Sequence, residues 1–308
     1  MDPVRQIAQA VLYEGYLLWP YRESSLKNRH RWTIGGVHPE AYGRANEGHP
    51  WLMRTECLLE GGPGDVVDVS VRFLHVVTRL REEAAGAGEE AQEREVSLPG
   101  LVLEDLLHGP VIEKIDVPAG QESSEGTVLR TRRALCGRIE AGARRLRPDL
   151  FRITVEVVNT TPWPGGTREE AMRRTLVSAH TVLHAPDARF VSLMDPPEDL
   201  RADAAACDNA GAWPVLAGPD GDRHTVLAAP IILYDHPRIA PESPGDLFDA
   251  TEIDQLLTLS VLALSDRERE EIRHGDPRAR AILDRCDSLT PEDLMRLHGI
   301  MRRTEPHE

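Results

Sequence analysis

Two histidines four positions apart have the spacing in this chain that most resembles a metal site. His180 and His184 stand in "HTVLH". On a helix this spacing puts both imidazoles on one face, as in many zinc sites. The neighbouring β-branched residues favour a strand, where the two side chains share a face but lie about 13 Å apart, at about 3.3 Å per residue. Position 181 is threonine, so HExxH is absent. We favour structural histidines unless His75, Cys136 or a distant carboxylate converges on them.

An acidic segment, residues 240–257, supplies carboxylates that could attract a hard cation. Glu252 is the carboxylate that we group with His180 and His184 as a candidate site of a metal-dependent hydrolase. The spacing does not match an EF-hand. A proline-defined loop before a capped helix, whose acids complement the helix dipole, explains the same residues and is favoured. The "SPGDLFD" part of this segment could instead contact a protein partner.

The N-terminal stretch "YEGYLLWPYRESSLKNRHRW", residues 13–32, mixes aromatic and basic side chains. Arginine stacks on aromatic rings and binds carboxylates through two hydrogen bonds, so the mixture suits an anion site or a partner-binding surface. The anionic-ligand alternative rests on Arg22, Lys27 and Arg29. A purely structural role is an equal alternative, in which the aromatic side chains lie in the core and the arginines pair with local carboxylates. The candidate binding residues are Trp19, Tyr21, Arg22, Lys27, Asn28, Arg29 and Trp32.

The chain shows no signature of nucleophilic catalysis or phosphate binding. Neither GxSxG nor GxxxxGK[ST] occurs. Cys207 is flanked by Asp203 and Asp208, which would raise the pKa of its thiol. The four cysteines lie far apart without a CxxC pair, which is typical of reduced thiols in the cytoplasm. We therefore assign no catalytic residue, and any cofactor stays unknown.

The composition limits the possible partners. The 308 residues include 51 acidic and 36 basic side chains, giving a formal net charge of -15, which argues against nucleic-acid binding. The hydrophobic fraction of 41% is enough for a real core. No long apolar run is present, and the N-terminus is a poor secretory signal. We expect a cytoplasmic protein without a membrane span.

Hydrophobic periodicity predicts the elements that must position these residues. Residues 4–12 have apolar positions at helix spacing, and residues 66–79 alternate as a half-buried strand with His75 on the apolar face. Thr167 and Glu170 form a capping-box pattern before a short helix. Further extended runs occupy residues 111–120, 127–146, 149–163, 175–197 and 222–237, whereas 81–96 is expected to be a solvated connection and 120–126 a turn.

After residue 250 the pattern becomes helical. Three N-cap signatures begin at Thr251, Ser265 and Thr290. The sequence therefore predicts an α+β fold: an antiparallel β-rich body of residues 1–250, carrying the N-terminal aromatic and basic segment, and a helical C-terminal subdomain of residues 251–308 packed on it.

Three phrases of the chain together resemble an uncharacterised, largely actinobacterial protein family. They are "YEGYLLWPYRESSLKNRHRWTIGGVHP", "VSAHTVLHAPDARFVSLMDPP" and "PIILYDHPRIAPESPGDLFDATEIDQLLTL". The resemblance implies an association with [NiFe]-hydrogenase gene clusters, and thus a role in hydrogenase assembly, maturation or partner binding. It supplies no catalytic residues.

The leading hypothesis is a non-enzymatic accessory protein that binds a protein partner, such as a hydrogenase subunit. Two alternatives remain open. One is the metal-dependent hydrolase using His180, His184 and a carboxylate such as Glu252, and the other is a protein that binds a small anionic ligand.

Overall fold

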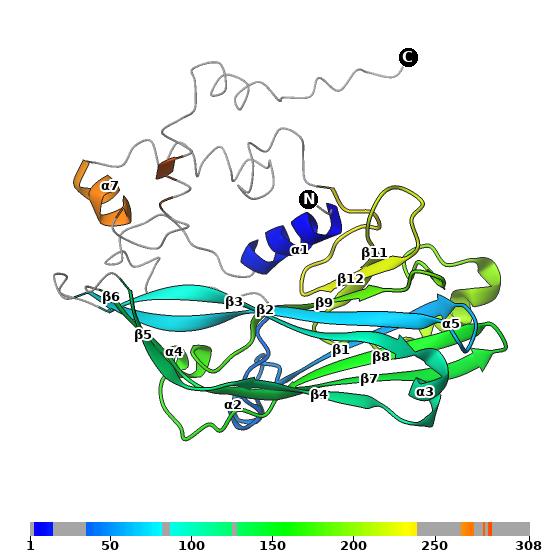
Figure 1. The fold of residues 1–308 in the computed structure, drawn as a ribbon, viewed down its shortest axis with the longest axis horizontal. Helices are drawn as coiled ribbons and strands as arrows, with labels where there is room; N and C mark the ends of the chain where they lie inside the picture. The colour runs from blue at the N-terminus through cyan, green and yellow to red at the C-terminus, as the bar shows by residue number, and fades with distance from the viewer. Residues whose placement is uncertain are drawn as a thin grey trace, which may run out of the picture. The chain divides into compact units, whose positions relative to one another are not determined.

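The computed structural model describes residues 3–14, 35–81, 87–124, 128–238, 266–273, 280 and 283–284. They fall in two compact units. The first unit holds the described residues up to Arg238, and the second holds helix α7 (Asp266–Arg273). The first unit consists mostly of antiparallel strands arranged in two sheets (Figure 1).

The first sheet has five strands in the order β10-β1-β8-β7-β4. Every neighbouring pair is antiparallel. The sequence makes β7 and β8 a hairpin because two alternating apolar runs are separated only by Pro148 and Asp149. The strands are β10 (Arg189–Phe190), β1 (Leu52–Glu60), β8 (Leu150–Asn159), β7 (Leu135–Arg147) and β4 (Val111–Val117).

The second sheet has seven strands, and its longest are β2 and β3. One edge of β2 pairs with β3, while the other pairs first with β9 along 68–74 and then with β6 along 78–81. The sheet therefore splits beside His75, between the ends of β6 and β9. The strands are β11 (Trp213–Leu216), β12 (Thr225–Ala229), β9 (Val177–His184), β2 (Val66–Arg81), β6 (Val128–Arg132), β5 (Gly120–Ser124) and β3 (Ala87–Val102).

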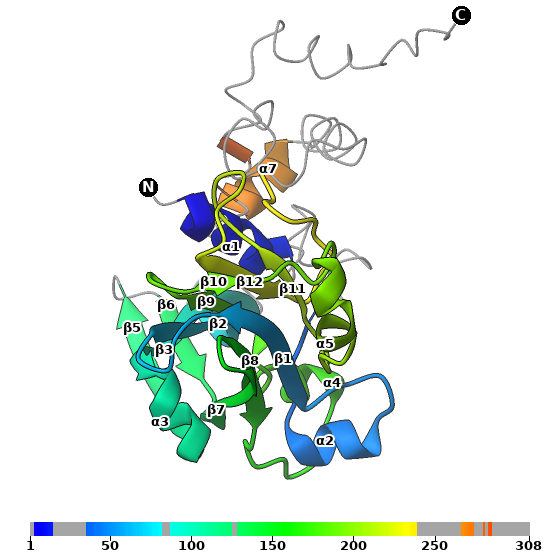
Figure 2. The ribbon, with the colours of Figure 1, turned by 90° about the vertical axis from the view of Figure 1, so that its right-hand side faces the viewer.

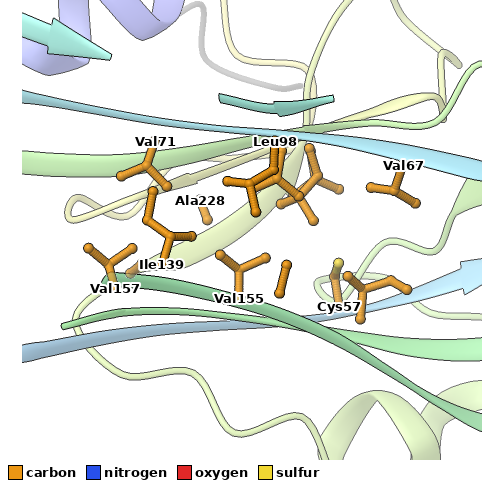
Figure 3. Close-up of a cluster of buried hydrophobic side chains, with 14 of the residues drawn as sticks. Cys57, Val67, Val71, Leu98, Ile139, Val155, Val157 and Ala228 are labelled. Atoms are coloured by element: carbon orange, nitrogen blue, oxygen red, sulfur yellow. The ribbon is translucent and has the colours of Figure 1, made fainter. Parts of the chain in front are cut away.

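The main hydrophobic core lies between the two sheets (Figures 2 and 3). Alternate residues of each strand enter it, since successive side chains of a strand point to opposite faces. Val67 and Val71 of β2 enter from the second sheet, and Val155, Val157 and Ile139 enter from the first (Figure 3).

Six helices belong to the described part of this unit, and the longest of them covers one outer face of the sandwich. Helix α1 contacts β9, β12 and β2 on the outer face of the second sheet (Figures 1 and 2). Its Ile7, Ala8 and Val11 form a separate apolar cluster with Leu227 and Ala229 of β12. The helices are α1 (Pro3–Glu14), α2 (Glu40–Ala45), α3 (Leu103–His108), α4 (Arg168–Met172), η1 (Glu198–Leu200) and α5 (Arg201–Ala205).

The structure confirms the predicted antiparallel β-rich body. The helix expected at residues 4–12 is α1, and the strand expected at 66–79 is β2. Thr167 and Glu170 form the capping box of α4. Of the predicted helical C-terminal subdomain, helix α7 and residues 280 and 283–284 are described, and the rest, with the expected boundary at 250/251, lies outside the described residues. That subdomain stays a prediction.

Two predictions about connecting segments were wrong. Most of the expected solvated connection at 81–96 belongs to strand β3, and most of the expected turn at 120–126 is strand β5. The acidic side chains of β3 pair with arginines on other strands of the same sheet: Glu90 pairs with Arg130 of β6, on the far side of β2, and Glu95 lies 3.7 Å from Arg72 of β2. Because these partners are distant in sequence, local composition did not reveal the strand.

Candidate functional site

The sequence-predicted N-terminal site lies outside the described residues. This applies to Trp19, Tyr21, Arg22, Lys27, Asn28, Arg29 and Trp32. Glu252 and the "SPGDLFD" segment lie outside them as well. The structure therefore says nothing on whether these residues meet His180 or His184, and the corresponding hypotheses stay predictions.

His180 and His184 lie on strand β9, as their neighbours predicted. Both belong to the outer face of the second sheet, because they pair with Arg72 and Asp68 of β2. His180 is fully buried and its Nδ1 atom lies 3.1 Å from the Ser178 carbonyl oxygen. His184 is exposed, and its Nδ1 atom lies 3.0 Å from Thr225 Oγ1. The two imidazoles thus have separate environments.

The surroundings of His180 are a buried polar layer next to helix α1. Arg72 is 6% exposed, and it donates to Gln9 Oε1 of α1 at 2.5 Å and lies 3.5 Å from Glu93. The pKa of His180 is lowered to about 4, mainly by burial and also by Arg72, while the Ser178 backbone and Glu95 act in the opposite direction. A neutral imidazole under a helix is typical of a structural histidine.

Cys207 gains no activation from its surroundings. Burial raises the pKa of its thiol to about 11, and the carboxylates of Glu56 and Asp203 add to this effect against Arg152. The sequence predicted the direction of the shift from the neighbouring acids, but burial is the larger cause. The thiol is therefore a poor nucleophile at neutral pH.

A segment with exposed apolar side chains follows strand β12. Ile231 and Leu233 pack against the apolar cluster beneath α1, while Ile232 and Tyr234 are 73% and 79% exposed. Trp213, which pairs with Ala229 at the start of β11, is 46% exposed. The period of two shows an extended segment that buries one row of side chains and presents the other to solvent.

This segment is fixed to the sheet by its next two residues. Asp235 accepts hydrogen bonds from Ser192 Oγ at 2.5 Å and from the Leu216 backbone N–H at 2.8 Å. The His236 backbone N–H donates to the Leu216 carbonyl oxygen at 2.7 Å. Residues 235 and 236 therefore cover the outer edge of β11, and the exposed side chains before them sit on an anchored backbone.

A second polar constellation surrounds His38 and His49. The Nε2 atom of His38 lies 3.2 Å from the Nδ1 atom of His49, and the Nδ1 atom of His38 lies 3.0 Å from Thr175 Oγ1. Thr175 donates its hydroxyl proton to the Ala171 carbonyl oxygen at 2.9 Å. The hydroxyl oxygen is then an acceptor, so His38 carries its proton on Nδ1.

The tautomer of His49 follows from the direction of its hydrogen bond with His38. His38 Nε2 has a lone pair and accepts from His49 Nδ1–H, which leaves the lone pair of His49 on Nε2. Burial, together with the smaller effects of His49 and Arg168, lowers the pKa of His38 to about 3. His38 is thus neutral and buried, whereas His49 is half-buried.

The local sequence explains how the two histidines meet. Each one precedes a proline, which favours an extended backbone, and α2 separates the two His-Pro steps. The His38 backbone N–H donates to the Pro50 carbonyl oxygen at 2.8 Å. A Cβ on Gly43 would lie 2.5 Å from the His49 carbonyl oxygen, so this close return requires glycine.

The aromatic ring of Tyr42 contacts both histidines and a neighbouring tryptophan. The ring of Tyr42 lies 5.5 Å from His38, 5.3 Å from His49 and 5.4 Å from Trp163. The guanidinium of Arg174 lies 5.8 Å from the Trp163 ring. Sequence reasoning missed this group. The repeated His-Pro dipeptide at 38–39 and 49–50 was the signal that could have indicated it.

Searches of the described residues for metal-ligand clusters and for membrane-spanning helices, and of the whole chain for similar proteins, found nothing. Within the described ranges, no group of three or more histidine, cysteine, aspartate or glutamate side chains could hold a metal ion together. No helix among the residues that the structure describes is long and apolar enough to cross a membrane. Comparisons of the chain with family models, with curated proteins and with solved structures found no match.

Proposed function

We propose that this chain is a non-enzymatic, cytoplasmic accessory protein that binds a protein partner, and that the partner is a subunit of a [NiFe]-hydrogenase. The observation that supports partner binding is the anchored segment at 231–236, with Ile232 73% and Tyr234 79% exposed. The hydrogenase as partner rests on the resemblance of the three sequence phrases. One of those phrases, residues 230–259, begins with this segment.

The exposed pair has the properties of an interface centre. Large apolar and aromatic side chains contribute most of the binding energy when a partner covers them, and tyrosine is enriched among such residues. Ile232 and Tyr234 are held in place by the partly buried side chains of Ile231 and Leu233 and by the hydrogen bonds of Asp235. A fixed backbone lowers the entropy cost of binding.

The two alternative functions gain less support. The hydrolase hypothesis needs His180 as a metal ligand, but this side chain is fully buried beside Arg72, in an environment that disfavours a further cation. The anionic-ligand hypothesis rests on Arg22, Lys27 and Arg29, outside the described residues. Neither is favoured by a specific contact.

The test begins with affinity capture of the full-length chain from the cells that encode it. Mass spectrometry should identify a hydrogenase subunit among the captured proteins, and the purified subunit should then bind the purified chain directly. The double variant Ile232→Ser with Tyr234→Ser should weaken this binding at least about 10-fold, as expected for interface hot spots.

A matched control comes from the other sheet. Ile112 of β4 is 56% exposed, so Ile112→Ser changes a similarly exposed isoleucine away from the segment and should leave the affinity unchanged. Binding that resists the double variant would locate the interface elsewhere. Capture without any hydrogenase subunit would contradict the proposed partner.

A further inference from the structure

The His38–His49 pair has a geometry that the proposed partner-binding function does not use. We propose that these two histidines form a binding site for one divalent transition-metal ion of the zinc and copper class, which replaces the proton shared between them. The proposal is independent of the partner, because it rests on α2, β1 and the residues around Thr175 and not on the segment at 231–236.

The separation of the two nitrogens fits shared coordination. Imidazole nitrogens bind zinc at about 2.0–2.1 Å, so two such ligands at angles between octahedral and tetrahedral values lie about 2.9–3.4 Å apart. His38 Nε2 and His49 Nδ1 are 3.2 Å apart, with ring centroids at 4.7 Å and planes at 88°. A small rotation of the half-buried His49 ring would direct both lone pairs at one ion.

Binding requires a change of tautomer on His49 alone. In the metal-free chain His49 carries its proton on Nδ1 and donates it to His38 Nε2. On coordination this proton moves through solvent to His49 Nε2, so Nδ1 acquires the lone pair that it gives to the metal. Proton and charge balance without any further reactant, since both imidazoles are neutral before and after.

His38 already has the support that a metal-bound histidine needs. A ligating imidazole normally donates its other N–H to an oxygen acceptor, which fixes the ring and raises its basicity. His38 Nδ1 donates to Thr175 Oγ1 at 3.0 Å, and Thr175 is itself held by Ala171. The ring is therefore preoriented with Nε2 directed at His49.

Space beside the ligand atom is provided by Gly36. A Cβ at this position would lie 3.1 Å from His38 Nε2 and 3.1 Å from Thr175 Cγ2. Arg168 acts against a cation, because its charge lowers the pKa of His38. Because both ligands are neutral and Arg168 is positively charged, we expect the site to bind a metal ion weakly. Water would occupy the remaining coordination positions of the ion. Imidazole suits zinc and copper in this role.

The decisive measurement uses the full-length, untagged protein with copper alone and with zinc alone. With one equivalent of Cu²⁺, electron paramagnetic resonance should show coupling to two imidazole nitrogens. Zn²⁺ should raise the melting temperature in a saturable one-to-one manner, because it binds the folded state. His49→Gln should lose the two-nitrogen signal and bind zinc at least about 10-fold more weakly.

Three further variants distinguish zinc coordination by His38 and His49 from unspecific zinc binding. Thr175→Val should weaken zinc binding about 10-fold by removing the acceptor of His38 Nδ1–H. Gly36→Ala should weaken it by crowding Nε2. His108→Gln is the control, since His108 is an exposed histidine of α3 whose Nδ1 atom lies 2.8 Å from the Glu104 carbonyl oxygen and which belongs to neither candidate metal site. It should bind zinc like the original protein.

Other results would overturn the proposal. A copper spectrum with one nitrogen or none, or zinc binding that is equal in the His49→Gln and original proteins, excludes shared coordination. Equal losses in His108→Gln and His49→Gln would indicate unspecific binding to surface histidines. Should His49→Gln fail to fold, the copper spectrum of the original protein and zinc titration of Gly36→Ala still decide the question.

Discussion

Asp235 accepts a hydrogen bond from the backbone N–H of Leu216 at 2.8 Å, and this bond ties the segment with the exposed side chains to the edge of the second sheet. The same carboxylate accepts from Ser192 Oγ, which in turn accepts from the backbone N–H groups of Met194 and Asp195. One side chain thus joins two loops to β11.

Replacing Asp235 by alanine should therefore destabilise the fold. Two half-buried donors would lose their acceptor, and we expect a decrease of about 1–3 kcal/mol in the free energy of unfolding, measured by urea denaturation. Asp220→Ala serves as control, because Asp220 and Arg238 form a pair that is 70% exposed on both sides and contributes little. Equal losses in both variants would show that Asp235 has no special anchoring role.

The free energy of unfolding should fall as the pH decreases from about 6.5 to 4. The pKa of His75 is lowered to about 4, mainly by burial and also by Arg94 and Arg132, while backbone groups of Arg173 and Arg133 act in the opposite direction. In the unfolded chain a histidine titrates near 6.5. Between these values the unfolded state binds a proton that the folded state does not, so acid favours unfolding.

Each buried histidine of this kind contributes up to about 3 kcal/mol to the decrease in the free energy of unfolding between about pH 6.5 and 4. His180, whose pKa burial also lowers to about 4, should behave in the same way. Urea denaturation at several pH values between 4 and 8 measures the slope. His75→Leu and His180→Leu should each reduce it, and an unchanged slope in either variant would show that the pKa of that histidine is the same in the folded and the unfolded protein.

Cys207 should react slowly with an alkylating reagent in the folded protein. Its pKa is raised from 9.0 to about 11, mainly by burial, so the thiolate fraction at neutral pH falls by a factor on the order of 100. Mass spectrometry of iodoacetamide-treated protein, folded and in urea, measures the two rates. Similar rates in both conditions would mean that the thiol is not shielded.

The capping box of α4 should contribute about 1 kcal/mol to the free energy of unfolding. Thr167 Oγ1 accepts from the Glu170 backbone N–H at 3.3 Å, and Glu170 Oε2 accepts from the Thr167 backbone N–H at 3.1 Å. Thr167→Ala should lower the free energy of unfolding by that amount, as measured in urea. Thr167→Ser keeps the hydroxyl and should lose much less, and an equal loss would assign the effect to packing of the methyl group.

The strands were predictable where one face is apolar. In β2 the alternation of Val67, Val69, Val71 and Phe73 with polar residues indicates a half-buried strand, and these four side chains are buried in the core. Strand β3 was not predictable, since its Glu90, Glu93 and Glu95 resemble a solvated segment. Only pairing with Arg130 and Arg72 makes them compatible with a sheet.

The sites depended even more on tertiary structure. The sequence placed His180 and His184 on one strand face, but it did not show that His180 is buried beside α1 and Arg72. Nor could it place β9 and β10 in different sheets, although a short turn joins them. Burial and sheet membership arise from contacts between residues far apart in the chain, which local periodicity does not contain.

The sequence by itself determined which segments alternate, where α4 is capped and that the chain can bury a core, because these properties follow from side-chain period and local hydrogen bonding. The tertiary structure alone decided that His38 meets His49 and Thr175, and that Ile232 and Tyr234 face outward from an anchored segment. The physical reason is that proximity and exposure are set by packing of the whole fold, whereas period and capping are set within a few residues.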